Sequence, residues 1–156
     1  MAENTASTLR LAVAKDRDAI AKITHTAYEH YIKRLGYKPQ PMTADHTIWI
    51  EDGSVWVLEQ GAQIIAVLVL LNGPDGLLIY NIAVAPAAQH KGHGRRLMAF
   101  AEDEAKKLGC TRVILYTNEK MTENIAFYEK LGYTQYDRLP HPTRDNAWSI
   151  HMFKAV

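Results

Sequence analysis

The chain has 156 residues, and its 18 basic and 17 acidic side chains give a formal net charge of +1. A charge so close to zero, without a long basic run, argues against a nucleic-acid binder that works by bulk charge. Cys110 is the only cysteine, so a disulfide framework cannot form within one chain, and a reducing cytoplasm is the expected location.

No stretch of the sequence predicts secretion or membrane insertion. The N-terminus, MAENTASTLR, lacks the apolar core of a signal peptide. The longest apolar run, Ile64 to Leu71, is far too short to cross a bilayer. The length fits one core, and no linker or repeat divides it. We therefore expect a single domain over residues 1–156, with a loose polar leader at 1–8 and no membrane partner.

The first half is expected to hold one long helix and a group of strands. Asp16 is predicted to cap the helix and Gly36 to end it. The segment 37–42 is predicted to be irregular, because Pro39 and Pro41 cannot sit inside a helix. In chain order the expected elements are a strand at 9–14, a helix from Asp16 to about Leu35, a short helix at 44–50, strands at 55–59 and 64–71 joined as a hairpin at Gln60-Gly61, and a strand at 77–84.

The second half is expected to alternate helices with strands. Its clearest helix carries an apolar stripe from Leu97 to Leu108, in which Glu104 alone does not fit burial, and Gly109 is its stop signal. In chain order the expected elements are a helix at 95–108, a strand at 111–117, a short helix capped by Thr122 and ending at Leu131-Gly132, and strands at 133–138 and 148–153. This order predicts a mixed α/β domain.

The stretch QHKGHGRRL, residues 89–97, lies between an expected strand and an expected helix. The first N–H groups of a helix have no internal partner and the helix dipole is positive there, so a phosphate is stabilised at that end. Gly92 and Gly94 remove β-carbons that would hold a ligand away from the backbone, and they allow positive φ. The cations that would add contacts are Lys91, Arg95 and Arg96, with His90 and His93 if protonated.

The spacing of this loop separates the possible phosphate motifs. A Walker loop needs Gly-Lys-Ser or Gly-Lys-Thr, which is absent, and a dinucleotide fingerprint needs a third glycine where Leu97 stands. The pattern that fits is Gln-x-x-Gly-x-Gly. On AVAPAAQHKGHGRRLM the chain resembles the acetyl-CoA pyrophosphate loop of the GNAT acetyltransferase superfamily, and NIAFYEKLGY, residues 124–133, resembles the second signature of that family. A solvated basic turn is the alternative interpretation of the loop taken alone.

The resemblance, which covers nearly the whole chain, implies a fold and a reaction. The fold is α/β, with a mixed, mostly antiparallel central sheet flanked by helices. The reaction is transfer of the acetyl group of acetyl-CoA to a primary amine of a small molecule or peptide, by direct attack through a tetrahedral intermediate. The resemblance implies that the pyrophosphate is bound by Gln89, His90, Lys91, Gly92, His93, Gly94, Arg95 and Arg96.

The resemblance also implies how the rest of the donor is held. Its pantetheine arm would pair with the strand edge at Ile82, Ala83 and Val84, where this strand and the strand at 111–117 splay apart. An N–H group of Ile82 or Val84 would hold the oxyanion.

A second pair of residues is implied on the short helix. Asn124 and Tyr128 lie four residues apart and so share a face. By resemblance Asn124 contacts the pantetheine arm, and Tyr128 lies near the sulfur, where its phenol can act as general acid. The alternatives are helix-start capping for Asn124 and core packing for Tyr128.

The residue that takes the amine proton is not evident. An alkylammonium has a pKa near ~10, and many relatives use a glutamate on the strand before the loop, where this chain has Leu78. Tyr80 and Asn81 are the nearest polar side chains on that strand. Side chains that could act through water, with solvent as the remaining possibility, are His25, Glu29, His30, Glu51 and Asp52.

Several further expectations concern the acceptor and partners. Tyr37 is the preferred lid residue over the acceptor, with Tyr28 and Met42 nearby, whereas Tyr31 fits the core. No metal site is expected from the seven histidines, and Cys110 is expected to be a small buried residue. A homodimer is possible. The alternative functions are a non-catalytic acyl-CoA sensor or interaction module with the same fold and, less favoured, another nucleotide-phosphate binder.

Overall fold

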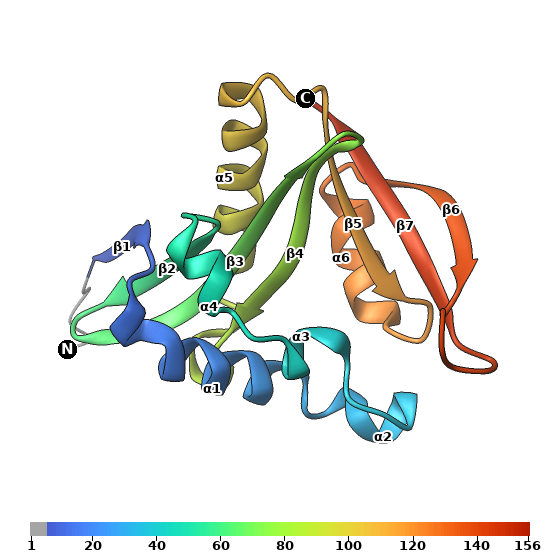
Figure 1. Cartoon of the computed structure of the whole chain (residues 1–156), viewed down its shortest axis with the longest axis horizontal. Helices are drawn as coiled ribbons and strands as arrows, with labels where there is room; N and C mark the ends of the chain where they lie inside the picture. The colour runs from blue at the N-terminus through green and yellow to red at the C-terminus, as the bar shows by residue number, and fades with distance from the viewer. Residues whose placement is uncertain (1–5) are drawn as a thin grey trace. The chain divides into compact units, whose positions relative to one another are not determined.

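Seven strands and six α-helices lie within residues 6–156, the part of the chain that the computed structural model describes. The strands are β1 (Ser7–Leu11), β2 (Val55–Gln60), β3 (Gln63–Gly73), β4 (Gly76–Val84), β5 (Arg112–Asn118), β6 (Thr134–Pro140) and β7 (Trp148–Ala155). The helices are α1 (Arg17–Tyr28), α2 (Tyr31–Leu35), α3 (Gln40–Thr43), α4 (Thr47–Glu51), α5 (His93–Lys107) and α6 (Thr122–Lys130) (Figure 1).

The strands are hydrogen-bonded in the order β1-β2-β3-β4-β5-β7-β6. β4 and β5 run parallel, whereas β1–β2, β2–β3, β5–β7 and β7–β6 are antiparallel pairs. The predicted mixed, mostly antiparallel sheet flanked by helices is therefore confirmed. Two compact units are present: the first holds the described residues up to Leu70 with Asn81–Leu97, and the second holds Leu71–Tyr80 with Met98–Val156.

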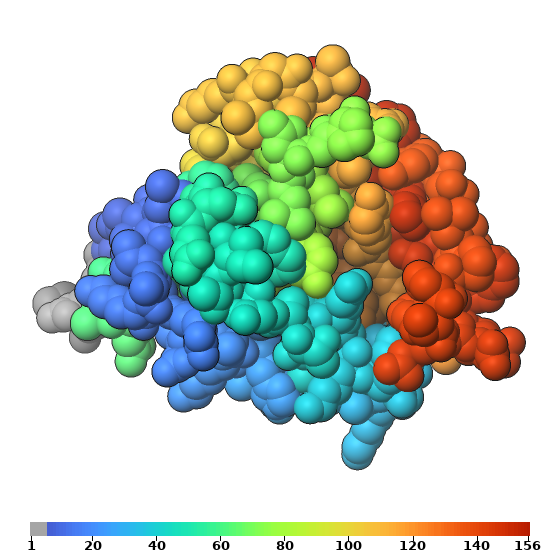
Figure 2. All heavy atoms as spheres, in the orientation of Figure 1, coloured from blue at the N-terminus to red at the C-terminus, as the bar shows by residue number. Residues whose placement is uncertain are grey.

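The first unit builds its core from β2, β3 and the apolar face of α1. The whole run from Ile65 to Leu70 in β3 is buried, which explains why its sequence is continuously apolar rather than alternating. α1 buries Ile20, Ile23 and Thr24, spaced three and four residues apart. Residues from α2 to α4 lie on the surface that faces the viewer in Figure 2.

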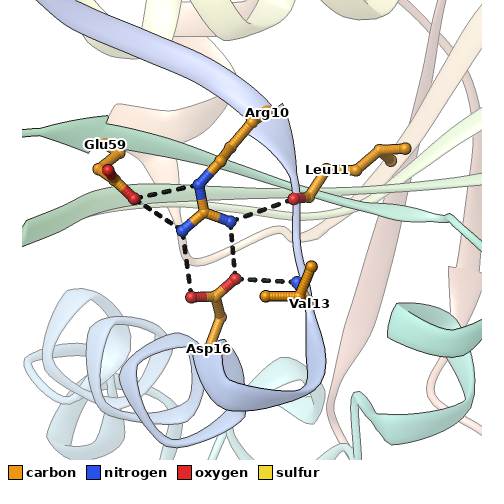
Figure 3. A network of polar contacts seen from close by, with 5 residues as sticks. All are labelled: Arg10, Leu11, Val13, Asp16 and Glu59. Carbon is orange, nitrogen blue, oxygen red and sulfur yellow. Dashed lines mark hydrogen bonds and ion pairs between the residues drawn. The ribbon is translucent and has the colours of Figure 1, made fainter.

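An ion-pair network joins β1 to the start of α1 (Figure 3). Arg10 donates to both oxygens of buried Asp16, at 2.8 and 3.2 Å, and to Oε2 of Glu59, at 2.7 and 3.0 Å. Asp16 also accepts the Val13 N–H at 2.8 Å. The Arg10 hydrogen bond is the main reason that the pKa of Asp16 lies below its ordinary value. Asp16 holds the cap position of α1, as predicted, although its side chain makes no capping bond to this helix.

The start of the chain differs from the predicted leader. Ser7 and Thr8 belong to β1, where they pair with Gln60 and Glu59. The predicted leader is therefore wrong at these two residues, because a strand partner orders them, and its residues 1–5 lie outside the described part of the chain.

The predicted long helix is two helices, α1 and α2, separated by Glu29 and His30. Its apolar spacing continues across the break, with Tyr31 buried at the start of α2, so the spacing could not reveal the interruption. Gly36 ends α2 with a φ of 83°, as expected.

The segment predicted to be irregular contains α3. Pro41 occupies the first turn of this helix. The N–H groups of a first turn have no helical carbonyl to bond, so a proline there removes no helical hydrogen bond. The exclusion of a helix at 37–42 was therefore wrong, because it treated the first turn as helix interior.

The second unit packs β5, β7 and the later part of α5 around an apolar core. Val113, Leu115 and Met152 are buried, and Lys154 pairs with Glu102 of α5 at 2.7 Å. Leu108, the residue after the end of α5, is 53% exposed, so its predicted place in a buried stripe is wrong. Cys110 is only partly buried, with Sγ 3.5 Å from Asn72 Oδ1, so its predicted burial is also wrong.

Candidate active site

The glycine loop connects the end of β4 to α5 through a short 3-10 turn at Pro86–Ala88. α5 begins at His93, two residues earlier than expected, and its first helical bond joins the Arg96 N–H to the Gly92 carbonyl at 3.1 Å. The N–H groups ahead of Arg96 have no acceptor within the helix. The loop therefore ends in the arrangement of main-chain donors that the sequence predicts.

Gly92 is the position at which the loop requires glycine. Its φ is +87°, and a β-carbon built there would meet nothing within 4 Å, so open space adjoins the backbone. Gly94 does not need a positive φ, because it lies inside the first turn of α5. His90 has a φ of 64°, a left-handed conformation that the sequence did not predict for this residue.

The cations near the loop differ in what they contact. His90, Lys91 and Arg95 are exposed, so they are available to an approaching anion. The Arg96 guanidinium instead donates to Ser7 Oγ at 2.6 Å and to the Ser7 carbonyl at 3.4 Å. The role of each as a ligand for a phosphate stays a prediction.

The last residues of β4 present one edge toward β3 and another edge away from it. The Ala85 N–H donates to the Ile65 carbonyl at 2.8 Å, and because backbone direction alternates along a strand, Ile82 and Val84 face the opposite edge. On that edge the Tyr28 hydroxyl donates to the Ile82 carbonyl at 3.2 Å, and Gln89 Nε2 donates to the Val84 carbonyl at 3.0 Å.

A buried polar cluster joins this strand to α1 and to the residue before α4, and the sequence did not predict it. It consists of Thr24 of α1, His46 just before α4 and Asn81 of β4, and Asn81 is only 1% exposed. Asn81 Nδ2 donates to Thr24 Oγ1 at 3.0 Å and lies 3.4 Å from His46 Nε2. The Thr24 hydroxyl donates to the Ile20 carbonyl at 2.8 Å. Asn81 Oδ1 is buried without a hydrogen-bond partner among the described residues.

The surroundings of His46 disfavour its charged form. It is 3% exposed, and burial lowers its pKa below the ordinary value, which hydrogen bonding to the Ala44 backbone and the nearby Asp45 charge oppose. An amide nitrogen can only donate, so the contact with Asn81 requires an unprotonated Nε2. In the sequence, His46 is only a polar residue close to Ile48 and Ile50. This pattern is too common to identify a site.

The charged and histidine side chains considered as proton acceptors are all exposed. His25 and Glu29 are exposed and lie 3.6 Å from each other, and His30, Glu51 and Asp52 are also exposed. Burial raises the pKa of Tyr80, which makes its phenolate harder to form. Leu78 is apolar and half-buried.

The second signature places Asn124 and Tyr128 on α6, in the second unit. Tyr128 is 7% exposed, and its ring centroid lies 5.5 Å from that of Phe127 and 6.2 Å from that of Tyr133, which supports core packing. Asn124 Nδ2 lies 3.8 Å from Met121 Sδ. Thr122 begins α6, but Met121 holds the cap position and makes no side-chain cap bond, so the predicted Thr122 cap is wrong. The roles of Asn124 and Tyr128 toward a donor stay predictions.

Residues 18–133 match the model of the acetyltransferase (GNAT) family. The chain belongs to this family. The match includes both signatures and the segment from α1 to Tyr133, so the family resemblance seen in the sequence is confirmed.

Individual GNAT proteins resemble the chain in part or in fold. The uncharacterized N-acetyltransferase YvbK of Bacillus subtilis (strain 168) is 33% identical over 86 residues, which span 54% of this chain and 56% of that protein. The ribosomal-protein-S18-alanine N-acetyltransferase of Escherichia coli is 24% identical, with a TM-score of 0.75 over 97% of this chain and 94% of its own. The PaiA N-acetyltransferase of Thermoplasma acidophilum, solved in complex with coenzyme A, is 17% identical, with a TM-score of 0.75 over 97% and 99%.

Residues 6–156 hold neither a group of metal ligands nor a membrane-spanning helix. In this part of the chain no three His, Cys, Asp or Glu side chains are grouped so that they could bind a metal ion. None of its helices has the length and apolar character needed to span a bilayer.

Proposed function

We propose that the chain is an N-acetyltransferase that transfers the acetyl group of acetyl-CoA to a primary amine of a small molecule or a peptide. The observation that carries the proposal is the β4–loop–α5 connection, with Gly92 at a φ of +87° beside open space and main-chain donors at the start of α5. Family membership supports the same reaction.

The loop fits the diphosphate of coenzyme A in chemistry and in shape. Unpaired N–H groups and the positive end of the α5 dipole stabilise negative charge. The missing β-carbon at Gly92 lets an oxygen approach the backbone. The exposed cations Lys91 and Arg95 add charge at the rim. The Gln89 side chain bonds the Val84 carbonyl and so joins the loop to β4.

The end of β4 fits the thioester arm of the donor. The N–H groups of Ile82 and Val84 share one strand edge, and such groups can pair with the amide carbonyls of an extended arm. One of them, placed at the thioester carbonyl, would stabilise the charge that develops on oxygen during attack.

The transfer needs a neutral amine and a protonated leaving sulfur. The nitrogen lone pair forms the C–N bond and the C–S bond then breaks, so the amine loses one proton and the sulfur gains one. We propose Tyr128 as the donor to sulfur. Solvent is the simplest acceptor of the amine proton, because the carboxylates and histidines considered from the sequence are all exposed to water.

The reaction is tested by release of the CoA thiol from acetyl-CoA in the presence of a panel of small amines and peptide N-termini. The proposal expects release that depends on the amine, with a product whose mass is increased by one acetyl group. Binding of acetyl-CoA without release across the panel would instead favour the sensor function. Competition by ATP but not by CoA would favour another nucleotide-phosphate binder.

A further inference from the structure

The buried cluster around Asn81 is unusual for the core of a sheet. Asparagine is depleted in strands, and Asn81 of β4 is only 1% exposed. Its Oδ1 has no hydrogen-bond partner among the described residues, and an unsatisfied buried acceptor lowers stability. A wholly apolar arrangement of the three positions in the cluster would avoid this loss, so stability alone does not explain why the cluster is polar.

The cluster differs from apolar packing because it fixes a direction. Asn81 Nδ2 donates to Thr24 Oγ1 at 3.0 Å and lies 3.4 Å from His46 Nε2. The Thr24 hydroxyl donates its own hydrogen to the Ile20 carbonyl at 2.8 Å, so its oxygen is left as an acceptor for Asn81. Burial of apolar surface is non-directional, whereas these bonds hold the Asn81 amide between α1 and the residue before α4.

The end of β4 is attached to α1 at two successive residues. Asn81 bonds Thr24, and the carbonyl of the next residue, Ile82, accepts the Tyr28 hydroxyl at 3.2 Å. Thr24 and Tyr28 lie four residues apart and so share one face of the helix. Because one peptide bond joins Asn81 to Ile82, a displacement of Asn81 also displaces the main chain of Ile82.

We propose that Asn81 is a positioning residue for the transfer reaction. Held by Thr24 and His46, it fixes the main chain at the end of β4 and keeps the N–H group of Ile82 in the place that the thioester carbonyl requires. This inference rests on the proposed function, which assigns the N–H groups of this strand edge to the acyl donor. Asn81 acts through the backbone, so it needs no bond to the donor or to the amine.

The test is Thr24→Val, which removes the hydroxyl that accepts the Asn81 bond and nearly keeps the volume of the side chain. Asn81 is then held only on the side of His46, and the main chain after it is less well placed. We expect kcat to fall by about 3- to 30-fold, since a misplacement of about 1 Å can cost about 100-fold. The acetyl-CoA KM should stay within about 2-fold of the wild-type value, because the glycine loop is unchanged.

Two matched variants separate positioning from stability. Thr26→Val removes a hydroxyl that donates to the Lys22 carbonyl at 3.0 Å, and the hydrogen bonds of this hydroxyl stay within α1. It should keep the wild-type kcat and KM. Thr24→Ser keeps the hydroxyl and removes a buried methyl group, so it should lower the melting temperature but restore kcat relative to Thr24→Val.

A purely structural role for the cluster predicts that kcat follows stability. Equal losses of kcat in Thr24→Ser and Thr24→Val would therefore overturn the inference, as would a wild-type kcat in folded Thr24→Val. A rise of KM in Thr24→Val without a fall of kcat would also overturn it, because the donor would then be bound less tightly rather than misplaced.

Amide hydrogen exchange separates this inference from the proposed function. At saturating acetyl-CoA the Ile82 N–H should exchange more slowly than in the free protein, and this protection should be several-fold smaller in Thr24→Val than in Thr26→Val. Should the wild type release no CoA with any amine, the proposed transfer fails, while this difference in protection still supports the inference. Equal protection in the two variants would overturn the inference, and absence of acetyl-CoA binding by the wild type would overturn both.

Discussion

The glycine loop and the buried cluster around Asn81 both adjoin the last residues of β4, but they are built in opposite ways. The loop uses main-chain groups of a few consecutive residues around Gly92, whose φ of +87° leaves open space beside it. The cluster joins side chains 57 and 35 residues apart, those of Thr24, His46 and Asn81. A site made of local backbone leaves a spacing motif in the sequence, whereas a site made of distant side chains leaves none.

The largest effect should come from changing the loop at its one obligatory glycine. Gly92→Val places a branched side chain in the open space beside the backbone and at an unfavourable φ. We expect the acetyl-CoA KM to rise by about 100-fold, equivalent to about 2.7 kcal/mol of lost binding. Steady-state kinetics on the folded variant measures this change.

The control for Gly92→Val is Gly61→Val in the β2–β3 turn. Gly61 also has a positive φ, of 62°, and open space at its β-carbon, so the substitution carries similar backbone strain away from the loop. It should lower the melting temperature without raising KM. A folded Gly92→Val protein with the KM of the wild type would show that the loop does not hold the donor.

A smaller effect is expected at Tyr128, where packing and chemistry compete as explanations. Tyr128→Phe keeps the buried ring and removes the hydroxyl. If the phenol protonates the leaving sulfur, kcat should fall by about 10- to 100-fold with little change in CoA affinity. Thiol release and CoA binding should be compared in the same preparation, and unaltered turnover would leave Tyr128 with a packing role alone.

The smallest expected effect is on the pH dependence of stability, and it comes from His46 in the buried cluster. Burial lowers the pKa of His46 from its ordinary 6.5, so below that pH the unfolded chain binds a proton that the folded chain does not. The free energy of unfolding should therefore be constant above about pH 6.5 and decrease as the pH falls toward the pKa of folded His46.

His46→Gln should remove this part of the pH dependence. The measurement is denaturant unfolding of both proteins at several pH values. His151→Gln is the appropriate comparison, because the pKa of His151 is also lowered by burial. This variant measures the part of the pH dependence of unfolding that comes from a buried histidine outside the cluster. Equal pH dependence in wild type and His46→Gln would contradict the assignment of a buried neutral imidazole.

The comparison of loop and cluster also explains how much the sequence could predict. The sheet, its flanking helices and the strand–loop–helix connection follow from apolar spacing and glycine positions, and the structure confirms them. The break between α1 and α2 and the first-turn proline of α3 were missed, because apolar spacing continues through the break and the proline rule was applied too broadly. Thr24 and His46 were missed because nothing near them in the sequence indicates that they meet Asn81.

The hydrogen bonds from Tyr28 and Gln89 to β4 were predicted less well than the glycine loop and better than the buried cluster. The motif identified Gln89 as part of the loop, and Tyr28 was considered only as a lid residue. Neither pattern indicated that both side chains would bond alternate carbonyls of one strand edge. Such contacts depend on where a helix docks, which local sequence does not specify.

The central claim is that main-chain donors around Gly92 and the edge of β4 bind the acyl donor. Titration of acetyl-CoA into the folded wild-type protein, with the heat of binding measured by calorimetry, tests this claim most directly. Binding with a dissociation constant between about 1 μM and 1 mM is expected, the range of typical enzyme–substrate KM values. Absence of heat from acetyl-CoA at millimolar concentration, with protein shown to be folded, would contradict the account.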